Sequence, residues 1–437
     1  MSAATDRWGA VLQSGTERGV ALFDAAVLDL VSLNGEPVAA AEAVVAADDD
    51  LVLGHVLRAY LHLYGASADG VANARKILED LDDVTELDER EVLHLRAARS
   101  WAKGQWDEAT HFLERALLHD SRDLLALKVA QDLYFFLGQS TDIKGVVARV
   151  LGAWPADKVG WSYVQGMHAF GLEEVGDYER AEISARAALQ KEPRDVWASH
   201  ALAHVFEMQG RQPEGVAFIE ASSPYWSSSF FAVHNWWHDA LYHLELGDHH
   251  RAVSRYDGPI RATRSTEWLD LVDAASLLWR LTLYGQDVAD RPQSLAVDAE
   301  SVLGEPVYLF NDWHAVMAFG LAGSHDLNER VLTANRRQAH GTNRLVAEQV
   351  GLTLLEGFHS FSLGRYERAL DLLSEARPFA SAVGGSHAQR DILDLTILAA
   401  AARSGQHSAA RAFAADRVAR RPSSAAATEL ILHANGL

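Results

Sequence analysis

The residues best suited to chemistry in this sequence are two His-x-x-x-His pairs, His200/His204 and His234/His238. Seven of the 20 histidines fall between residues 194 and 250, so imidazole groups are concentrated in this stretch. Glu207 follows His204 by three residues. The i, i+4, i+7 spacing predicts that His200, His204 and Glu207 share one face of a helix.

A metal site is the first chemistry that this pattern allows. Two histidines one helical turn apart, together with a carboxylate, provide enough ligands for Zn, Fe or Mn. If a metal is bound, we expect its ligands among His200, His204, His234 and His238. The pattern lacks the glutamate of an HExxH metalloprotease helix, so the two pairs do not by themselves specify a metal enzyme.

Acid–base catalysis without a metal is the second possibility. One histidine would act as general base or acid, oriented by Glu207, Glu173 or Asp312, while neighbouring tryptophans exclude water. The third possibility is structural: the histidines and tryptophans fill a groove, hydrogen-bond between helices or form a surface that recognises a peptide. Burying a histidine without a partner is costly, which favours a partner or a ligand for each of them.

Two further polar stretches allow a binding role. Asp312 stands near the start of an expected helix, where it either caps the helix or provides a carboxylate for His234 or His238. Arg390 follows a Gly-Gly break and precedes Asp391. It either holds a substrate carboxylate at a helix N-terminus or pairs with an acidic residue in the interior.

The composition excludes several functions. The 437 residues include no cysteine, which rules out disulfides, thiolate metal ligands and a cysteine nucleophile. The net charge of −21 argues against a nucleic-acid partner, because an acidic surface repels phosphate. The last lysine is Lys191, so the histidine-rich half has no Schiff-base lysine. No phosphate loop or nucleotide fingerprint appears, and we identify no cofactor from the sequence.

We expect a cytoplasmic protein without a membrane partner. The first residues lack the basic and apolar regions of a signal peptide. No run of about 18 apolar residues suggests a membrane span. The sequence leaves open whether the chain forms a homodimer.

An internal repeat predicts the elements that position the histidines. A glycine recurs with a small residue five positions later, in Gly104/Ala109, Gly176/Ala181, Gly210/Gly215, Gly247/Ala252, Gly364/Ala369 and Gly405/Ala410. Gly176 and Gly210 are 34 residues apart, and Gly210 and Gly247 are 37 apart. We interpret the glycine as the left-handed end of one helix, and the small residue as a close contact made by the next helix.

The segment AFGLEEVGDYERAEISARAALQKEP resembles a tetratricopeptide repeat, with Ala169, Leu172, Gly176, Tyr178, Ala181, Ala185, Ala188 and Pro193 at the offsets of that repeat. The resemblance implies an all-α fold, a right-handed superhelix of tetratricopeptide-like helix-turn-helix repeats. We expect three parts: N-terminal helical pairs with degenerate repeats (1–89), central repeats that carry the histidines (90–284), and an irregular insertion at 285–310 followed by C-terminal repeats (285–437).

A more specific resemblance covers nearly the whole chain. The blocks GMHAFGLEE, VWASHALAHVFEMQG, HNWWHDALYHLELGD, LFNDWHAVMA and GGSHAQRD are similar to blocks of the tetratricopeptide repeat protein 38 family. This resemblance implies that family motif positions are occupied by Glu173, His200, His204, Glu207, His234, Asn235, His238, Asp312, His314 and Arg390. The first block departs from the family pattern at His168, where tyrosine is expected.

The repeat register directs the histidines toward the concave groove of such an array. With Ala203 at position 8 of its repeat, groove positions 2, 5, 9 and 12 fall on Trp197, His200, His204 and Glu207. The preceding repeat provides Glu173, and the next one provides His234 and Trp237. Tryptophan, histidine and glutamate suit a small enclosed ligand better than an extended acidic peptide.

We therefore expect a site on the concave face that binds a small molecule or acts on it, with histidine as general acid or base. The expected catalytic residues are His200, His204, Glu207, His234, His238 and Asp312. The expected binding residues are Trp197, Trp237, Glu173, Asn235, His314 and Arg390. The alternatives are an adaptor that holds a peptide or partner protein in the same groove, and a metal-dependent enzyme that uses the four histidines.

Overall fold

The computed structural model describes residues 4–12 and 15–421, which form two compact units. Unit 1 contains the described residues up to Val205 together with Ser222–Ala232. Unit 2 contains Phe206–Ala221 and the described residues from Val233 onward. The central segment expected at 90–284 contributes to both units.

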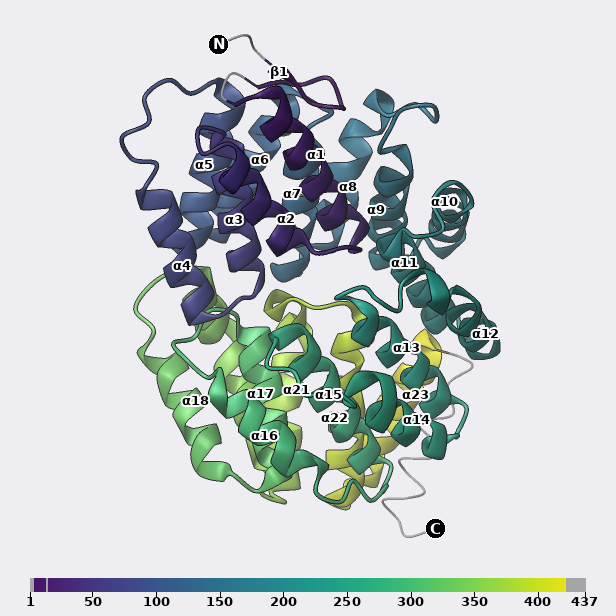
Figure 1. The fold of residues 1–437 in the computed structure, drawn as a ribbon. Coiled ribbons are helices and arrows are strands. Elements are labelled where there is room, and N and C mark those ends of the chain that lie inside the picture. Colours follow the sequence, from purple (N-terminus) through teal and green to yellow (C-terminus); the bar gives the residue numbers. More distant parts are fainter. Residues whose placement is uncertain (1–3, 13–14, 422–437) are drawn as a thin grey trace. The chain divides into compact units, whose positions relative to one another are not determined.

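Unit 1 consists of successive helix-turn-helix pairs, which Figure 1 shows side by side. A small antiparallel hairpin precedes them, with β1 (Ala4–Thr5) paired to β2 (Val11–Leu12). The helices are α1 (Glu17–Ser32), α2 (Pro37–Ala47), α3 (Val52–Tyr64), α4 (Ala68–Glu79), α5 (Glu89–Ala102), α6 (Trp106–His119), α7 (Leu124–Phe136), α8 (Ser140–Val150), α9 (Trp161–Glu174), α10 (Tyr178–Lys191) and most of α11 (Val196–Met208). Two 3-10 turns are η1 (Leu151–Ala153) and η2 (Ser223–Tyr225).

Unit 2 repeats the same pairing of helices. Its helices are α12 (Gln212–Ser222), α13 (Ala232–Glu245), α14 (His249–Arg255), α15 (Trp268–Leu283), α16 (Arg291–Ser301), α17 (Leu309–Ala322), α18 (His325–Arg337), α19 (Thr342–Val346), α20 (Leu352–Ser362), α21 (Tyr366–Ala376), α22 (His387–Arg403) and α23 (His407–Arg420). Two π-helical turns are η3 (Tyr256–Ile260) and η4 (Ala347–Gly351), and η5 (Arg377–Val383) is a 3-10 helix.

The repeating glycines end the first helix of each pair, as the sequence predicts. All six have a positive φ, between 69° at Gly210 and 81° at Gly176. This left-handed conformation is cheap for glycine and strained for residues with a Cβ. Gly138, Gly285 and Gly323 adopt it too and mark further repeats.

The small residues after the turns pack where two helices meet. Ala109, Ala181, Ala252 and Ala369 are fully buried. At Gly215, a Cβ would lie 2.5 Å from the ring of Tyr242 on the following helix, so this contact excludes even alanine without movement. These contacts confirm the predicted all-α fold of tetratricopeptide-like helix-turn-helix repeats.

The segment 285–310 differs from the irregular insertion that we expect from its glycines and prolines. Gly285 ends α15 with φ 72°, and the regular helix α16 (Arg291–Ser301) follows as the second helix of the pair. Pro292 lies in the first turn of α16, where the missing N–H has no helical partner to lose. Proline therefore begins this helix and does not interrupt it.

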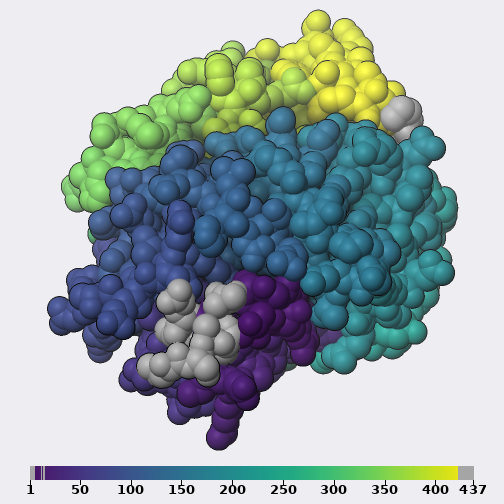
Figure 2. Space-filling model, turned by 90° about the horizontal axis from the view of Figure 1, so that it is seen from above, coloured from purple at the N-terminus to yellow at the C-terminus, as the bar shows by residue number. Residues whose placement is uncertain are grey.

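The core of each unit lies between its helices and is rich in alanine, leucine and valine. In unit 2, α15 packs against both α17 and α22, which brings together segments more than 100 residues apart in the sequence. Figure 2 shows one face of the surface of unit 1, coloured from purple to teal. In the described part of the chain, no helix combines the length and the apolar character needed to cross a membrane.

Candidate functional site

Helix α13 provides the second histidine pair and its tryptophan in unit 2. His234, Trp237 and His238 recur at three- and four-residue spacing, so they lie on one side of this helix. They are 3%, 0% and 0% exposed, respectively. The ring of His234 stacks on Trp237 with 5.2 Å between the centroids, and His238 meets His234 edge-on at 4.9 Å.

Each of these histidines binds a buried carboxylate through Nδ1. His238 Nδ1 lies 2.9 Å from Glu207 Oε2, and His234 Nδ1 lies 2.9 and 3.0 Å from the two oxygens of Asp273. Glu207 and Asp273 are 3% and 1% exposed, so both pairs are screened from water. Such a pair orients the ring and favours the tautomer with its proton on Nδ1.

Burial determines the charge of His238. It lowers the pKa of His238 well below its usual value, and the charges of His234 and Arg280 act in the same direction. Burial likewise raises the pKa of Asp273, although His234 and Arg280 oppose that shift. A neutral imidazole whose Nδ1 donates to a carboxylate has the basic lone pair on Nε2, as a general base requires.

Arg280 on α15 is the charged residue at this site that the sequence does not reveal. Its guanidinium is 2% exposed, and Cζ lies 5.4 Å from the centroid of the Trp237 ring. Burial lowers the pKa of Arg280 to about 10, while Asp391 and Glu207 oppose that shift. In the sequence, Arg280 is a single arginine within the amphipathic segment TEWLDLVDAASLLWRLTLY. This pattern gives little indication that its side chain is buried.

Two further arginines pair with the acidic groups of this site. Arg417 on α23 lies 2.9 Å from Asp391 and 2.9 Å from Glu245. Arg421, which follows α23, lies 3.5 Å from Glu207 and 3.8 Å from Asp391. The end of the described chain therefore contributes positive charge to the same carboxylates.

The first histidine pair lies on α11 in unit 1. His200 and His204 are 2% and 0% exposed, and their Nε2 atoms are 2.9 Å apart. Phe170 on α9 contacts both rings and also the ring of Trp197, at centroid distances between 4.7 and 5.6 Å. Phe170 thus joins α9 to the side of α11 that carries Trp197, His200 and His204.

Unit 1 also contains a group of metal-ligand type. One donor atom from each of Glu173, Glu174 and His204 lies within 4.8 Å of the other two, and all three residues are buried. Glu173 Oε2 is 3.6 Å from His204 Nδ1, which is an ion-pair distance and too long for a good hydrogen bond. Glu174 extends the donor set beyond the residues predicted from the repeat register.

Asp312 does not take either of its expected roles. Helix α17 begins at Leu309 with Tyr308 as its cap, so Asp312 lies in the first turn and is not the capping residue. Its carboxylate accepts a hydrogen bond from Asn335 at 3.0 Å, whereas the two histidines take Asp273 and Glu207. Burial raises the pKa of Asp312 to about 7.

The remaining predicted residues also have defined environments. His314 Nδ1 donates to the carbonyl of Phe310 at 2.8 Å, and burial lowers the His314 pKa to about 3. Asn235 is fully buried, and its amide atoms have no hydrogen-bond partner among the described residues. Arg390 donates to the carbonyls of Gly384 and Gly385. Its guanidinium therefore holds the Gly-Gly loop, and the substrate-binding role expected for Arg390 stays a prediction.

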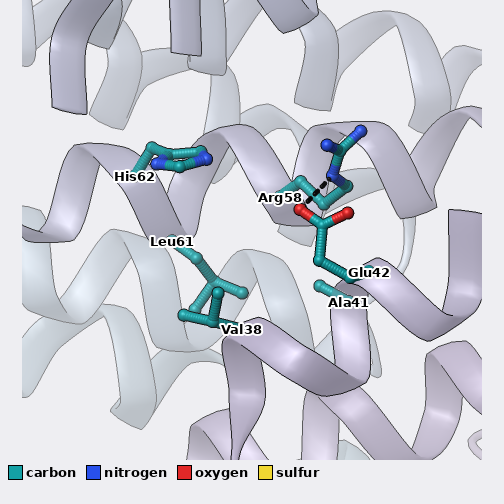
Figure 3. Close-up of a pocket in the computed structure, with 6 residues that line it drawn as sticks. All are labelled: Val38, Ala41, Glu42, Arg58, Leu61 and His62. Carbon is teal, nitrogen blue, oxygen red and sulfur yellow. Dashed lines mark hydrogen bonds and ion pairs between the residues drawn. The ribbon is translucent and has the colours of Figure 1, made fainter. Parts of the chain in front are cut away.

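A small surface depression lies elsewhere in unit 1, between α2 and α3. Figure 3 shows its lining residues, among which Arg58 Nε binds Glu42 Oε1 at 2.9 Å. The histidine pairs take no part in it.

The fold and these buried groups define an all-α protein of tetratricopeptide-like helix pairs with a polar interior. No family model matches the chain, and membership of the tetratricopeptide repeat protein 38 family remains a prediction.

Three solved structures illustrate what the chain is similar to. A Rap protein in complex with competence and sporulation factor is 13% identical, with 84% of this chain and 99% of that chain covered and a TM-score of 0.48. A human IFIT1 dimer with m7Gppp-AAAA is 15% identical over 88% of this chain and 86% of that one, with a TM-score of 0.42. A tetratricopeptide repeat protein from Parabacteroides merdae is 13% identical over 71% and 99%, with a TM-score of 0.32.

Proposed function

We propose that unit 2 carries a small-molecule site in which His238, oriented by Glu207, acts as a general base. The observation that supports this most directly is the 2.9 Å contact between His238 Nδ1 and Glu207 Oε2. A carboxylate at Nδ1 directs the basic lone pair to Nε2, the atom that would take a proton from a bound compound.

The surroundings of His238 support the same role. Burial lowers its pKa, so the ring is neutral at neutral pH and carries a free lone pair on one ring nitrogen. His234 forms a second histidine–carboxylate pair with Asp273 next to it, which supplies a further acid–base or orienting group. Trp237 packs against His234 and excludes water from that side.

The degree of burial favours a small ligand over an extended peptide. A peptide in a groove needs a continuous accessible surface. His234, Trp237 and His238 are at most 3% exposed, and so they suit a ligand that is enclosed on binding. The adaptor function and the metal-dependent function expected of His200, His204, His234 and His238 remain the alternatives. Glu173, Glu174 and His204 form a further buried group of metal-ligand type.

A comparison of variants on a mixture of natural compounds tests the general base. Full-length wild type and His238→Asn are incubated with a small-molecule extract of cells, and mass spectrometry follows compounds consumed and formed. We expect at least one conversion that His238→Asn slows by roughly 100-fold or more, the usual contribution of a positioned base. Glu207→Gln, which keeps the size of the side chain, should slow the same conversion.

Arg330→Met is the matched control, because Arg330 is an exposed residue paired with Glu300 on the surface of unit 2. It should convert the same compounds as the wild type. If wild type and His238→Asn treat the extract identically, His238 is not a general base.

A further inference from the structure

Arg280 and Trp237 bring two kinds of buried hydrogen-bond donor close together. Arg280 lies on α15 and Trp237 on α13, both within unit 2. The guanidinium carbon is 5.4 Å from the centroid of the indole ring, and the two residues are 2% and 0% exposed. Groups buried this deeply need partners within the protein or from a ligand.

The guanidinium of Arg280 binds only neutral oxygens among the described residues. Nη1 donates to the hydroxyl and the carbonyl of Ser276, and Nη2 donates to the carbonyls of Ala388 and Gln389, at 2.9 and 3.5 Å. In the described part of the chain, no ion pair joins Arg280 to a carboxylate, although Asp391 and Glu207 act on its charge from farther away. A buried cation is thus held without a direct counterion.

Arg417 is a buried arginine of the same unit that has direct carboxylate partners. It is 1% exposed, and its guanidinium lies 2.9 Å from both Asp391 and Glu245. These carboxylates keep the pKa of Arg417 above its usual value in spite of burial, whereas burial lowers the pKa of Arg280. The two equally buried arginines therefore differ in that, among the residues described, Arg417 has direct counterions and Arg280 has only neutral acceptors.

The acidic groups around Arg280 have closer partners of their own. Asp273 binds His234, and Glu207 binds His238. Asp391 binds Arg417. None of these carboxylates therefore serves as the direct partner of Arg280.

Trp237 adds a buried donor group that, unlike the guanidinium, has no acceptor in the part of the chain that the structure describes. Its indole Nε1–H has no acceptor among the described residues, although the side chain is fully buried. A buried N–H without an acceptor costs free energy unless a ligand provides one. Two adjacent donor groups without an anionic acceptor indicate a ligand that brings an acceptor.

We infer that Arg280 and Trp237 bind a carboxylate group of the small molecule that occupies the proposed site, an inference that rests on the proposed function. A carboxylate supplies the negative charge that the guanidinium lacks, and its lone pairs can accept a hydrogen bond from an indole N–H. This anchor would hold the compound beside His238, whose charge already responds to Arg280. The substrate class is therefore a small carboxylic acid.

Calorimetric titration of the full chain tests this inference with simple probes. Acetate, succinate and benzoate are each compared with the corresponding amide, and inorganic phosphate serves as a tetrahedral anion. We expect saturable binding of at least one carboxylate, at least tenfold tighter than its amide and tighter than phosphate. Trp237→Phe keeps the ring and removes the N–H, so it should weaken that binding about tenfold. Arg280→Lys keeps the charge but loses the planar fork, and it should weaken binding by tenfold or more.

Two matched variants and one site variant complete the test. Trp313→Phe also loses a buried indole N–H without an acceptor in the described chain, but Trp313 packs on Phe310 and Phe358 and should bind as wild type does. Arg330→Met should likewise bind as wild type does. His238→Asn should bind the carboxylate within threefold of wild type, so loss of the general-base role would appear in conversion and not in this titration.

The inference is overturned if no carboxylate binds better than its amide, if phosphate binds more tightly than every carboxylate, or if Trp237→Phe binds as wild type does. If Arg280→Lys does not fold, the inference is still tested in two ways. One is the comparison of carboxylates with amides and phosphate on the wild type, and the other is the binding measured for Trp237→Phe.

Discussion

Replacing Asp312 with asparagine should make the protein more stable at neutral and higher pH and leave it unchanged in acid. Asp312 is 6% exposed, and burial raises its pKa from 3.8 to about 7. Its carboxylate has a neutral partner, Asn335, which donates to Oδ2 at 3.0 Å. An asparagine amide oxygen can accept the same hydrogen bond, so Asp312→Asn removes the charge and keeps the contact.

The direction of the pH effect follows from where the proton is bound. Between the unfolded and the folded pKa, the native state holds a proton on Asp312 that the unfolded state has lost. The free energy of unfolding therefore falls as the pH rises through this interval. A shift of roughly 3 pKa units corresponds to about 4 kcal/mol, the share of destabilisation that a charged Asp312 contributes above about pH 7.

Urea unfolding of wild type and Asp312→Asn, followed by circular dichroism across this pH range, measures the effect. We expect the two proteins to unfold with similar free energies near pH 4 and to differ by up to about 4 kcal/mol near pH 8, with the variant more stable. The carboxyl carbon resonance of Asp312 should titrate near neutral pH in the same protein. A difference that is independent of pH, or a variant less stable at high pH, would refute the reasoning.

Asp298 provides a control for which the pH dependence of stability should have the opposite sign. Burial works against ionisation there, but hydrogen bonds from Arg264 and Arg261 prevail and lower the pKa of Asp298. Its charge therefore contributes stability above the unfolded pKa, and this contribution is lost as the pH falls through the folded pKa. Asp298→Asn should destabilise the protein at neutral pH and should matter less in acid.

Two further predictions concern the packing of unit 2. Gly215→Ala places a Cβ 2.5 Å from the Tyr242 ring and should lower the free energy of unfolding by about 1–3 kcal/mol, measured by urea denaturation; an unchanged midpoint would contradict the close helix contact. Arg417→Met removes the arginine that lies 2.9 Å from the buried carboxylates of Asp391 and Glu245 and should cost about 3–5 kcal/mol in the same assay, whereas a cost below about 1 kcal/mol would show that these pairs stabilise little.

The sequence by itself predicts the repeat and its register, because both depend on local chain geometry. A left-handed glycine and a small residue five positions later recur wherever a helix pair turns, and these positions behave as expected at Gly176 and Ala181. The same register predicts that His200 and His204 lie on one side of α11. The glycine and proline breaks at 285–310 predicted an irregular insertion, but this segment contains the regular helix α16.

Only the tertiary structure decides which acid binds each histidine. His238 takes Glu207, 31 residues away, and His234 takes Asp273, 39 residues away, whereas Asp312 is left with Asn335. These pairings depend on the angles at which helices cross and on the rotamers that burial permits. The spacing of residues along one helix determines neither of them.

Arg280 is the clearest case of a residue that the sequence conceals. Within an apolar helix pattern it resembles a surface arginine at the end of a buried stripe. Packing of α15 against α22 turns it into a buried cation, because Ala388 and Gln389 on α22 accept its hydrogen bonds. The sequence thus determines the scaffold and the histidine-bearing faces, while long-range packing determines the electrostatics of the site.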